Sequence, residues 1–134
     1  MKLFFIIFFS MITIVKAEIS IRQYNDLYCY DGDTCYVTIN GQNEKIRLLE
    51  LDTPEISKPK CDAELELGLK ARDFVNDLIK NAKTIEFKTD YELDYFGRIL
   101  SYLIIDGEDV SALLVQNGLG VVYKKGHKMD WCES

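Results

Sequence analysis

The sequence predicts one mainly β domain of the α+β class, with the strand order of a five-stranded OB-fold barrel. Two observations lead to this expectation. Five short stretches alternate apolar and polar residues or are rich in β-branched residues, and an amphipathic helical stretch follows the third of them. A short helical stretch follows the fifth. This order is that of an OB-fold, whose open face often binds nucleic acids, and 134 residues suit a single domain.

The strands are expected at residues 19–30, 35–39, 45–51, 83–91 and 99–105, and the helices at residues 62–82 and 110–117. Asn40-Gly41 is a strong hairpin signal between the second and third strands, so the first three strands should form a meander. Asp62 is the expected N-cap of the long helix. Gly118 is expected to end the short one.

Residues 1–17 are expected to be a signal peptide, which leaves residues 18–134 as the domain. Lys2 precedes an apolar run at residues 3–15, and Val15 and Ala17 supply small residues before a cut after Ala17. The run is shorter than the roughly 20 residues that an ordinary membrane-spanning helix needs. A retained anchor is the alternative. Export leads to a secreted or periplasmic protein that is free of the membrane after cleavage.

The net charge argues against binding nucleic acid by bulk electrostatics. It is −6 for the whole chain, and loss of Lys2 and Lys16 with the signal peptide would make it −8. That sign repels a polyanion. Phosphate chemistry must therefore depend on a local group of residues, with a metal ion offsetting the acidic side chains.

Export permits disulfides, and four cysteines allow three pairings. Cys29 and Cys35 lie symmetrically about Gly32, so a hairpin bend there would place them opposite each other on one face. Cys61 and Cys132 would then pair. Metal binding by thiolates is the alternative, although no two cysteines have a C-x-x-C spacing.

Charged residues gather where strands are expected to end. Asp31, Asp33 and Asp52 offer three hard oxygen ligands, which suggests a Ca²⁺ or Mg²⁺ site. Arg47, on the third strand, suggests a phosphate ligand beside that metal, and Arg98 is a second arginine of this kind. The alternative is an ordinary turn followed by a strand end with solvated charges.

These motifs resemble the staphylococcal nuclease (thermonuclease) family of secreted, Ca²⁺-dependent nucleases. The resemblance covers residue 28 to about residue 123 and rests on three signatures: Asp31-Gly32-Asp33-Thr34, Arg47-Leu48-Leu49 leading to Asp52-Thr53-Pro54-Glu55, and Gly97-Arg98. It implies an enzyme that hydrolyses phosphodiester bonds of DNA and RNA with little sequence preference. We expect a monomer without a stable protein partner.

The resemblance also implies roles for single residues. Asp33 and Asp52 would bind Ca²⁺ through their carboxylates and Thr53 through its carbonyl, with Asp31 acting through water. Glu55 would orient or deprotonate the attacking water. Arg47 and Arg98 would bind the phosphodiester and stabilise the charge that builds on it, a task that suits the planar guanidinium.

Other positions depart from the family pattern. Phe96 stands where the family usually has a tyrosine, which removes a hydroxyl, although Tyr95 adjoins it. The long C-terminal helix of the best-known member has no counterpart here. Tyr95, Phe96, Tyr123 and the loop residue Lys58 are the candidate substrate contacts.

Two other functions fit the same fold. A non-catalytic module that binds nucleic acid or protein would typically have lost the arginines or the glutamate, whereas Arg47, Glu55 and Arg98 are all present. An exported structural domain with a Ca²⁺ site would leave both arginines unexplained.

Overall fold

A computed structural model of the chain describes residues 3–4, 6, 10, 12 and 18–133. The predicted signal peptide therefore lies largely outside the described residues. The elements are β1 (Ile19–Ile21), β2 (Asn25–Cys29), β3 (Thr34–Ile39), β4 (Gln42–Leu48), α1 (Asp62–Asn81), β5 (Ile85–Thr89), β6 (Ile99–Ile105), β7 (Glu108–Asp109) and α2 (Val110–Gln116).

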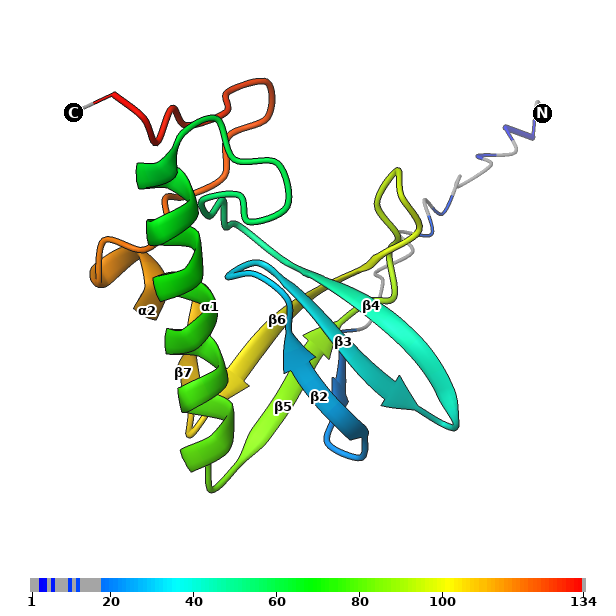
Figure 1. Cartoon of the computed structure of the whole chain (residues 1–134). Helices are drawn as coiled ribbons and strands as arrows, with labels where there is room; N and C mark the ends of the chain where they lie inside the picture. The colour runs from blue at the N-terminus through cyan, green and yellow to red at the C-terminus, as the bar shows by residue number, and fades with distance from the viewer. Residues whose placement is uncertain (1–2, 5, 7–9, 11, 13–17, 134) are drawn as a thin grey trace.

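The strands form one curved sheet in the order β1-β5-β6-β4-β3-β2, with β7 paired to β6 (Figure 1). The expected meander is present, because β2, β3 and β4 pair antiparallel in succession. β4 and β6 then pair parallel, which brings Arg47 opposite Leu100. Among the described residues no ladder joins the outer strands β1 and β2, so hydrogen bonds do not close the barrel.

The expected first strand, residues 19–30, is wrong as a single element, because it divides into two strands on opposite edges of the sheet. Ile21 pairs with Phe87 of β5, whereas Tyr28 pairs with Tyr36 of β3. The chain must cross between these edges, and Tyr24 packs its ring edge-on against Phe87 during the crossing, with ring centroids 5.8 Å apart. The partners of the two strands lie far apart in the sequence, so the local pattern of residues 19–30 does not reveal the crossing.

The expected third strand also differs in its bounds, since it starts at Gln42 and ends at Leu48 rather than spanning residues 45–51. Glu50 has a positive φ of 58°, which bends the backbone out of the sheet. The Asp52 and Val121 backbones then exchange two hydrogen bonds of 2.9 Å. This turn carries residues 51–55 away from the sheet and towards α1.

The N-cap of α1 is Cys61 and not Asp62 as expected. Because the Cys61 sulfur accepts the Glu64 backbone N–H at 3.4 Å, Asp62 becomes the first helical residue. The short helix behaves as predicted at its end, where Gly118 has a positive φ of 70° after Asn117. The fourth strand is shorter than expected and spans Ile85–Thr89.

The core lies between the sheet and α1, which runs along one side of the sheet (Figure 1). Its largest fully buried side chains come from the sheet, the segment after β4 and both helices: Phe87, Ile46, Leu48, Leu51, Leu103, Leu114, Val75 and Val110. Neither helix in the described part of the chain is long and apolar enough to cross a membrane.

Two disulfides link these elements, with the pairing that the sequence suggests. Cys29 is joined to Cys35 between β2 and β3. Cys61, at the start of α1, is joined to Cys132 near the C-terminus. The second bond anchors a segment that otherwise contains little regular structure.

Candidate active site

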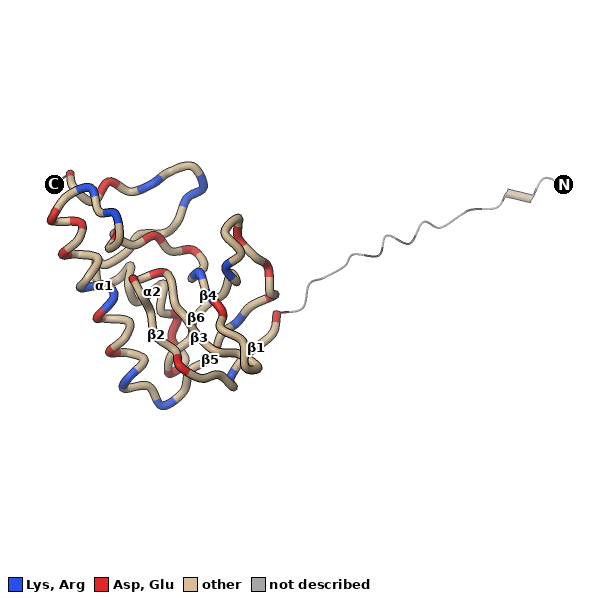
Figure 2. The backbone as a smooth tube through the Cα atoms, turned by 45° about the vertical axis from the view of Figure 1, so that its right-hand side comes forward, with Lys and Arg blue, Asp and Glu red and all other residues tan. Residues whose placement is uncertain are grey.

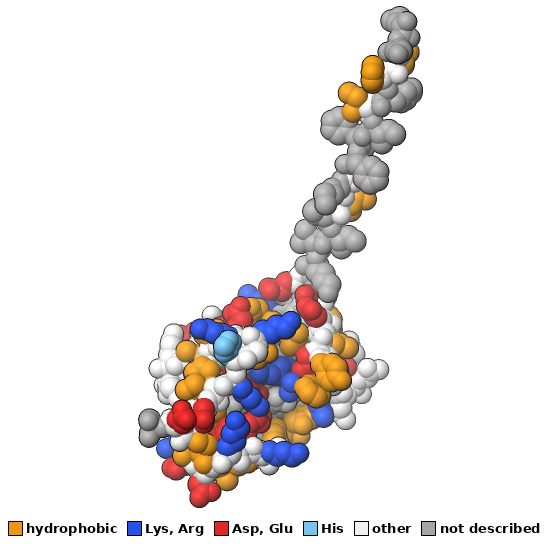
Figure 3. All heavy atoms as spheres, turned by 90° about the horizontal axis from the view of Figure 1, so that it is seen from above, with side chains coloured by type: hydrophobic (Ala, Val, Ile, Leu, Met, Phe, Trp, Pro, Cys, Tyr) orange, Lys and Arg blue, Asp and Glu red, His pale blue; other side chains and the backbone are white. Residues whose placement is uncertain are grey.

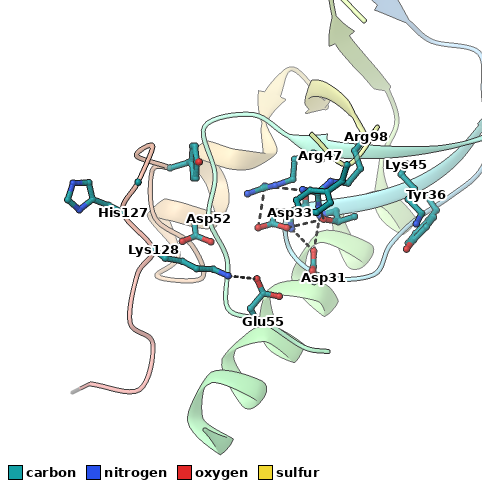
Figure 4. Close-up of a pocket in the computed structure, with 14 residues that line it drawn as sticks. Asp31, Asp33, Tyr36, Lys45, Arg47, Asp52, Glu55, Arg98, His127 and Lys128 are labelled. Carbon is teal, nitrogen blue, oxygen red and sulfur yellow. Dashed lines mark hydrogen bonds and ion pairs between the residues drawn. The ribbon is translucent and has the colours of Figure 1, made fainter. Parts of the chain in front are cut away.

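A pocket of about 670 Å³ lies at the ends of β3, β4 and β6. Space-filling Figure 3 shows this hollow with basic and acidic side chains gathered in and around it. It is lined by Asp31, Asp33, Thr34, Tyr36, Lys45, Arg47, Asp52, Glu55, Phe96, Arg98, Tyr123, Gly126, His127 and Lys128. Figure 4 shows Arg47, Arg98, Asp33 and Asp31 grouped at its centre, with Glu55 and Lys128 to one side.

The tight turn before β3 supplies the first carboxylates. Asp31 accepts the backbone N–H groups of Asp33 at 3.1 Å and Thr34 at 2.8 Å, which fixes the turn. Asp33 accepts the Thr34 hydroxyl at 3.1 Å and the Thr53 backbone N–H at 3.2 Å. The side chain of Asp33 therefore joins the turn to the segment after β4.

Arg47 is held on several sides. Its guanidinium lies 3.2 Å from the Asp33 carboxylate and donates to the Leu48 carbonyl at 3.1 Å and the Leu51 carbonyl at 2.8 Å. Only 16% of its side chain is exposed. These bonds close the turn after β4 and hold the guanidinium rigidly at the pocket.

Arg98 approaches from the start of β6. Its Nε donates to Asp94 at 2.6 Å, and its Nη1 lies 3.4 Å from the Thr34 hydroxyl. Burial raises the pKa of Asp94, but the backbone N–H and the guanidinium of Arg98 outweigh it and hold that pKa below the ordinary value. Asp94 therefore stays charged and orients Arg98, whereas both arginines keep further donors for an oxyanion.

Close backbone packing positions Glu55 and Asp52. A Cβ at Gly68 of α1 would lie 2.9 Å from the Pro54 carbonyl, and one at Gly32 would lie 2.7 Å from the Thr53 side chain. Glycine at both positions lets residues 52–55 pack between α1 and the Asp31 turn. Buried Glu64 adds a direct bond, because its carboxylate accepts the Glu55 backbone N–H at 3.3 Å.

Residues 124–132, here called the C-terminal segment, form the opposite side of the pocket. Lys128 lies 3.4 Å from the Glu55 carboxylate, and the Met129 N–H donates to Asp52 at 3.4 Å. In Figure 2 this segment lies near the C-terminus and carries several basic residues. Its covalent anchor is the Cys61–Cys132 disulfide.

Three carboxylates of the pocket, Asp31, Asp33 and Asp52, lie close enough to disfavour one another's charged forms. Burial, followed by the neighbouring Asp33 charge, raises the pKa of Asp31 to about 7. Burial also raises the pKa of Asp52. The hydrogen bond from the Met129 N–H lowers this pKa, and the negative charge of Asp33 raises it further. Their oxygens are hard donors without nitrogen or sulfur, so this set suits a Ca²⁺-type cation, which would relieve the repulsion. Among the described residues, however, no three acidic, histidine or cysteine residues converge tightly enough to enclose a metal by themselves.

The structure brings most of the expected site residues together. Thr53 is buried below the pocket, and its hydroxyl has no hydrogen-bond partner in the described part of the chain. Phe96 and Tyr123 line the pocket, but Tyr95 lies in a neighbouring depression with Asp94. Lys58 is exposed on its loop and does not line the pocket.

Several lining residues were not expected from the sequence. Tyr36 and Lys45 are on outward-facing positions of β3 and β4, where alternation alone marks ordinary solvated residues. His127 and Lys128 lie on the C-terminal segment, which the long-range Cys61–Cys132 disulfide ties back towards the pocket. The cysteine spacing was the available signal for that return.

The fold and this pocket define a class: a small mainly β domain with a cleft in which two arginines face acidic side chains. A family model described as "Staphylococcal nuclease homologue" matches residues 45–131, more than half of the chain. The chain therefore belongs to the staphylococcal nuclease family and has its OB-fold. The match contains Arg47, Asp52, Glu55 and Arg98 but begins after the Asp31 turn.

Three curated relatives are consistent with this family membership. SPbeta prophage-derived endonuclease YokF of Bacillus subtilis strain 168 is 37% identical over 93 residues, which cover 69% of this chain and 31% of the relative. Endonuclease YncB of the same strain is 36% identical over 93 residues, which cover 69% of this chain and 44% of the relative. Thermonuclease of Staphylococcus hyicus is 31% identical over 98 residues, which cover 73% of this chain and 57% of the relative. The matched part of the chain thus spans less than two thirds of the length of these relatives.

Proposed function

We propose that this chain is a Ca²⁺-dependent nuclease that hydrolyses phosphodiester bonds in DNA and RNA with low sequence specificity. The observation that carries the proposal is the meeting of Arg47, Arg98 and Glu55 in one pocket with Asp33 and Asp52. The relatives named endonuclease and thermonuclease support the same reaction. Substrate choice would rest on the phosphate, which every nucleotide shares.

Each protein group has a task that its surroundings support. Arg47 and Arg98 would bind the non-bridging phosphate oxygens and stabilise the charge that grows at the phosphorus in the transition state. Their preorganisation comes from the Asp33 and Asp94 carboxylates. Glu55, partly exposed at the pocket wall, would accept a proton from the attacking water as a general base.

Asp33, Asp52 and the Thr53 carbonyl would hold the Ca²⁺, with Asp31 acting through water. When bound, the ion would polarise a phosphate oxygen and offset the acidic charge of the pocket. Activity should be absent in excess EGTA and should return when Ca²⁺ is restored. Mg²⁺ should support turnover poorly because it demands stricter octahedral geometry.

Glu55→Gln tests the proposed function directly. The change keeps the shape of the side chain and removes its basicity, so the single-turnover cleavage rate of a labelled oligonucleotide in Ca²⁺ should fall at least ~10²-fold. Substrate binding should persist. Glu66→Gln, on the exposed face of α1, is the matched control and should cleave normally. Wild-type cleavage by a folded Glu55→Gln variant would refute this assignment and favour a non-catalytic binding module.

We further propose that residues 1–17 are removed on export and that the domain acts as a secreted or periplasmic monomer. The two disulfides support an oxidising destination. Mass spectrometry of the exported protein should find Glu18 as its first residue, and light scattering should give the mass of one chain. Retention of Lys2 in the exported protein would contradict the cleavage.

A further inference from the structure

One end of the pocket is built from residues to which the proposed chemistry assigns no task. Figure 4 shows Tyr36 and Lys45 side by side there, with His127 and Lys128 at the opposite end. The register pairs Tyr36 with Lys45 across β3 and β4, and Thr34 with Arg47 in the next outward-facing row. Two residues along a strand span about 7 Å. This row therefore lies directly beside the one that holds the phosphate-binding arginine.

A second tyrosine extends this row onto β2. Tyr28 pairs with Tyr36, and their rings stack with centroids 5.2 Å apart and planes inclined by 19°. Tyr28 is 54% exposed. Such a pair also stabilises a hairpin, but here the neighbouring pair in the register, Cys29 and Cys35, is already cross-linked by a disulfide. The disulfide holds the two strands together, so the rings are preorganised on a rigid surface.

Lys45 covers the face of the Tyr36 ring on which a ligand could stack. Its ammonium lies 5.6 Å from the Tyr36 ring centroid, as in a cation–π contact. Lys45 is exposed, and its flexible side chain gives way easily. A flat aromatic ligand could replace the ammonium over the ring, and the ammonium would then be free to pair with an adjacent phosphate.

We propose that Tyr28, Tyr36 and Lys45 form a stacking platform that holds an unpaired nucleobase next to the phosphate bound by Arg47. The proposal rests on the proposed function for the identity of that phosphate. Aromatic side chains stack on any base, whereas a base inside a duplex keeps both faces covered by its neighbours. The platform therefore makes single-stranded DNA or RNA the preferred substrate.

The test is binding of a fluorescent eight-residue oligothymidylate with phosphorothioate linkages, which resist cleavage, measured by anisotropy in Ca²⁺. Tyr36→Leu should weaken binding at least about fivefold, the lower range for losing one base–aromatic stack. Tyr28→Leu should weaken binding less, because Tyr28 supports the Tyr36 ring by stacking on it. Binding of a duplex of the same length should change less than twofold. Tyr36→Phe keeps the ring and should bind as the wild type does. Tyr91→Leu, an exposed tyrosine outside the pocket, is the matched control.

A base-deletion series separates stacking from a general loss of structure. Oligothymidylates with one abasic residue, moved along the strand, should identify one position where the wild type loses about fivefold in affinity. At that position Tyr36→Leu should lose no more, because the stack is already absent. The wild-type series remains decisive even if Tyr36→Leu fails to fold.

Four outcomes would overturn the platform: wild-type affinity of both leucine variants, an equal loss for duplex and single strand, no position sensitive to base deletion, or no binding of the oligonucleotide at all. The cleavage assay reports separately on the proposed function. Without cleavage, tyrosine-dependent binding would still support the platform and would leave only the nuclease proposal refuted.

Discussion

The two sides of the pocket differ in how they are held. The strand-built side, with the Asp31 turn, Arg47 and Arg98, is fixed by short hydrogen bonds and ion pairs within the sheet and the turns that join it. The C-terminal segment meets the pocket through an exposed lysine and one backbone N–H, and a single disulfide anchors its end.

The rigid side of the pocket is the one suited to catalysis. Groups that stabilise a transition state must be preorganised, and Arg47 satisfies that demand through its bonds to Asp33, Leu48 and Leu51. Lys128 has 69% of its side chain exposed, so its ion pair with Glu55 is weak and screened. We therefore expect the strand-built side to control the rate, and the C-terminal segment to adjust affinity and stability.

Arg47→Lys should have the largest effect on the rate. Lysine keeps the charge but cannot bind the Asp33 carboxylate and the Leu48 and Leu51 carbonyls together. Single-turnover cleavage should fall ~10²–10³-fold, as for loss of one preorganised transition-state donor. Circular dichroism should show a folded protein. A loss below threefold would place the rate-controlling groups elsewhere.

Asp94→Asn should have the next largest effect, because Asp94 orients Arg98 without touching the substrate. We expect a rate loss of about 10-fold, short of the ~10²-fold that a 1 Å misplacement can cost. Asp73→Asn, which removes a carboxylate from an exposed Asp–Arg pair, should have no effect.

The Asp94–Arg98 ion pair predicts that the stability of the fold decreases in acid. The folded-state pKa of Asp94 lies below its ordinary value of 3.8. The stability that the pair contributes is thus present above that value and is lost as the pH falls through the folded-state pKa. Urea unfolding from pH 6 to pH 2 should show a smaller loss for Asp94→Asn than for the wild type. Parallel curves would exclude this role for Asp94.

Removing the long-range disulfide should affect stability more than the rate. Cys61→Ser combined with Cys132→Ser opens a link between residues 71 apart, which should lower the free energy of unfolding by roughly 2–4 kcal/mol. Serine is a good N-cap, so α1 keeps its start. Cleavage below the unfolding transition should stay within tenfold of the wild type.

Opening the short Cys29–Cys35 link with two alanines gives the contrast to that variant. It should matter chiefly through the geometry of the adjacent Asp31 turn and of the Tyr28–Tyr36 pair. Equal effects of the two disulfides on cleavage would remove the distinction between the two sides of the pocket.

Lys128→Ala should have the smallest effect. We expect less than a threefold change in cleavage rate, with a modest loss of oligonucleotide affinity that shrinks as salt rises. Lys125→Ala is the control on the same segment. A loss comparable to that of Arg47→Lys would make the C-terminal segment part of the catalytic side.

Local sequence predicted the central elements well, since the β2–β4 meander, β6 and both helices depend on alternation, helical spacing and turn residues near one another. It failed where distant contacts decide. The division of residues 19–30 depends on pairing with β5, and the end of β4 at Leu48 depends on the bonds that Arg47 makes to the carbonyls after it. The reason for Gly68 inside α1 is also a distant contact, because residues 54–56 pack closely against it.

The fold class, the family signatures and the candidate site residues could all be predicted from the sequence, because charges such as Arg47, Asp52 and Glu55 stand at spacings that ordinary strands do not need. How these residues meet depends on long-range contacts of the folded chain. The parallel pairing of β4 with β6 brings Arg98 beside Arg47, and a disulfide returns residues 124–132 to the pocket. The stacked tyrosines emerged in the same way, since strand register, which no single segment encodes, sets which outward-facing side chains become neighbours.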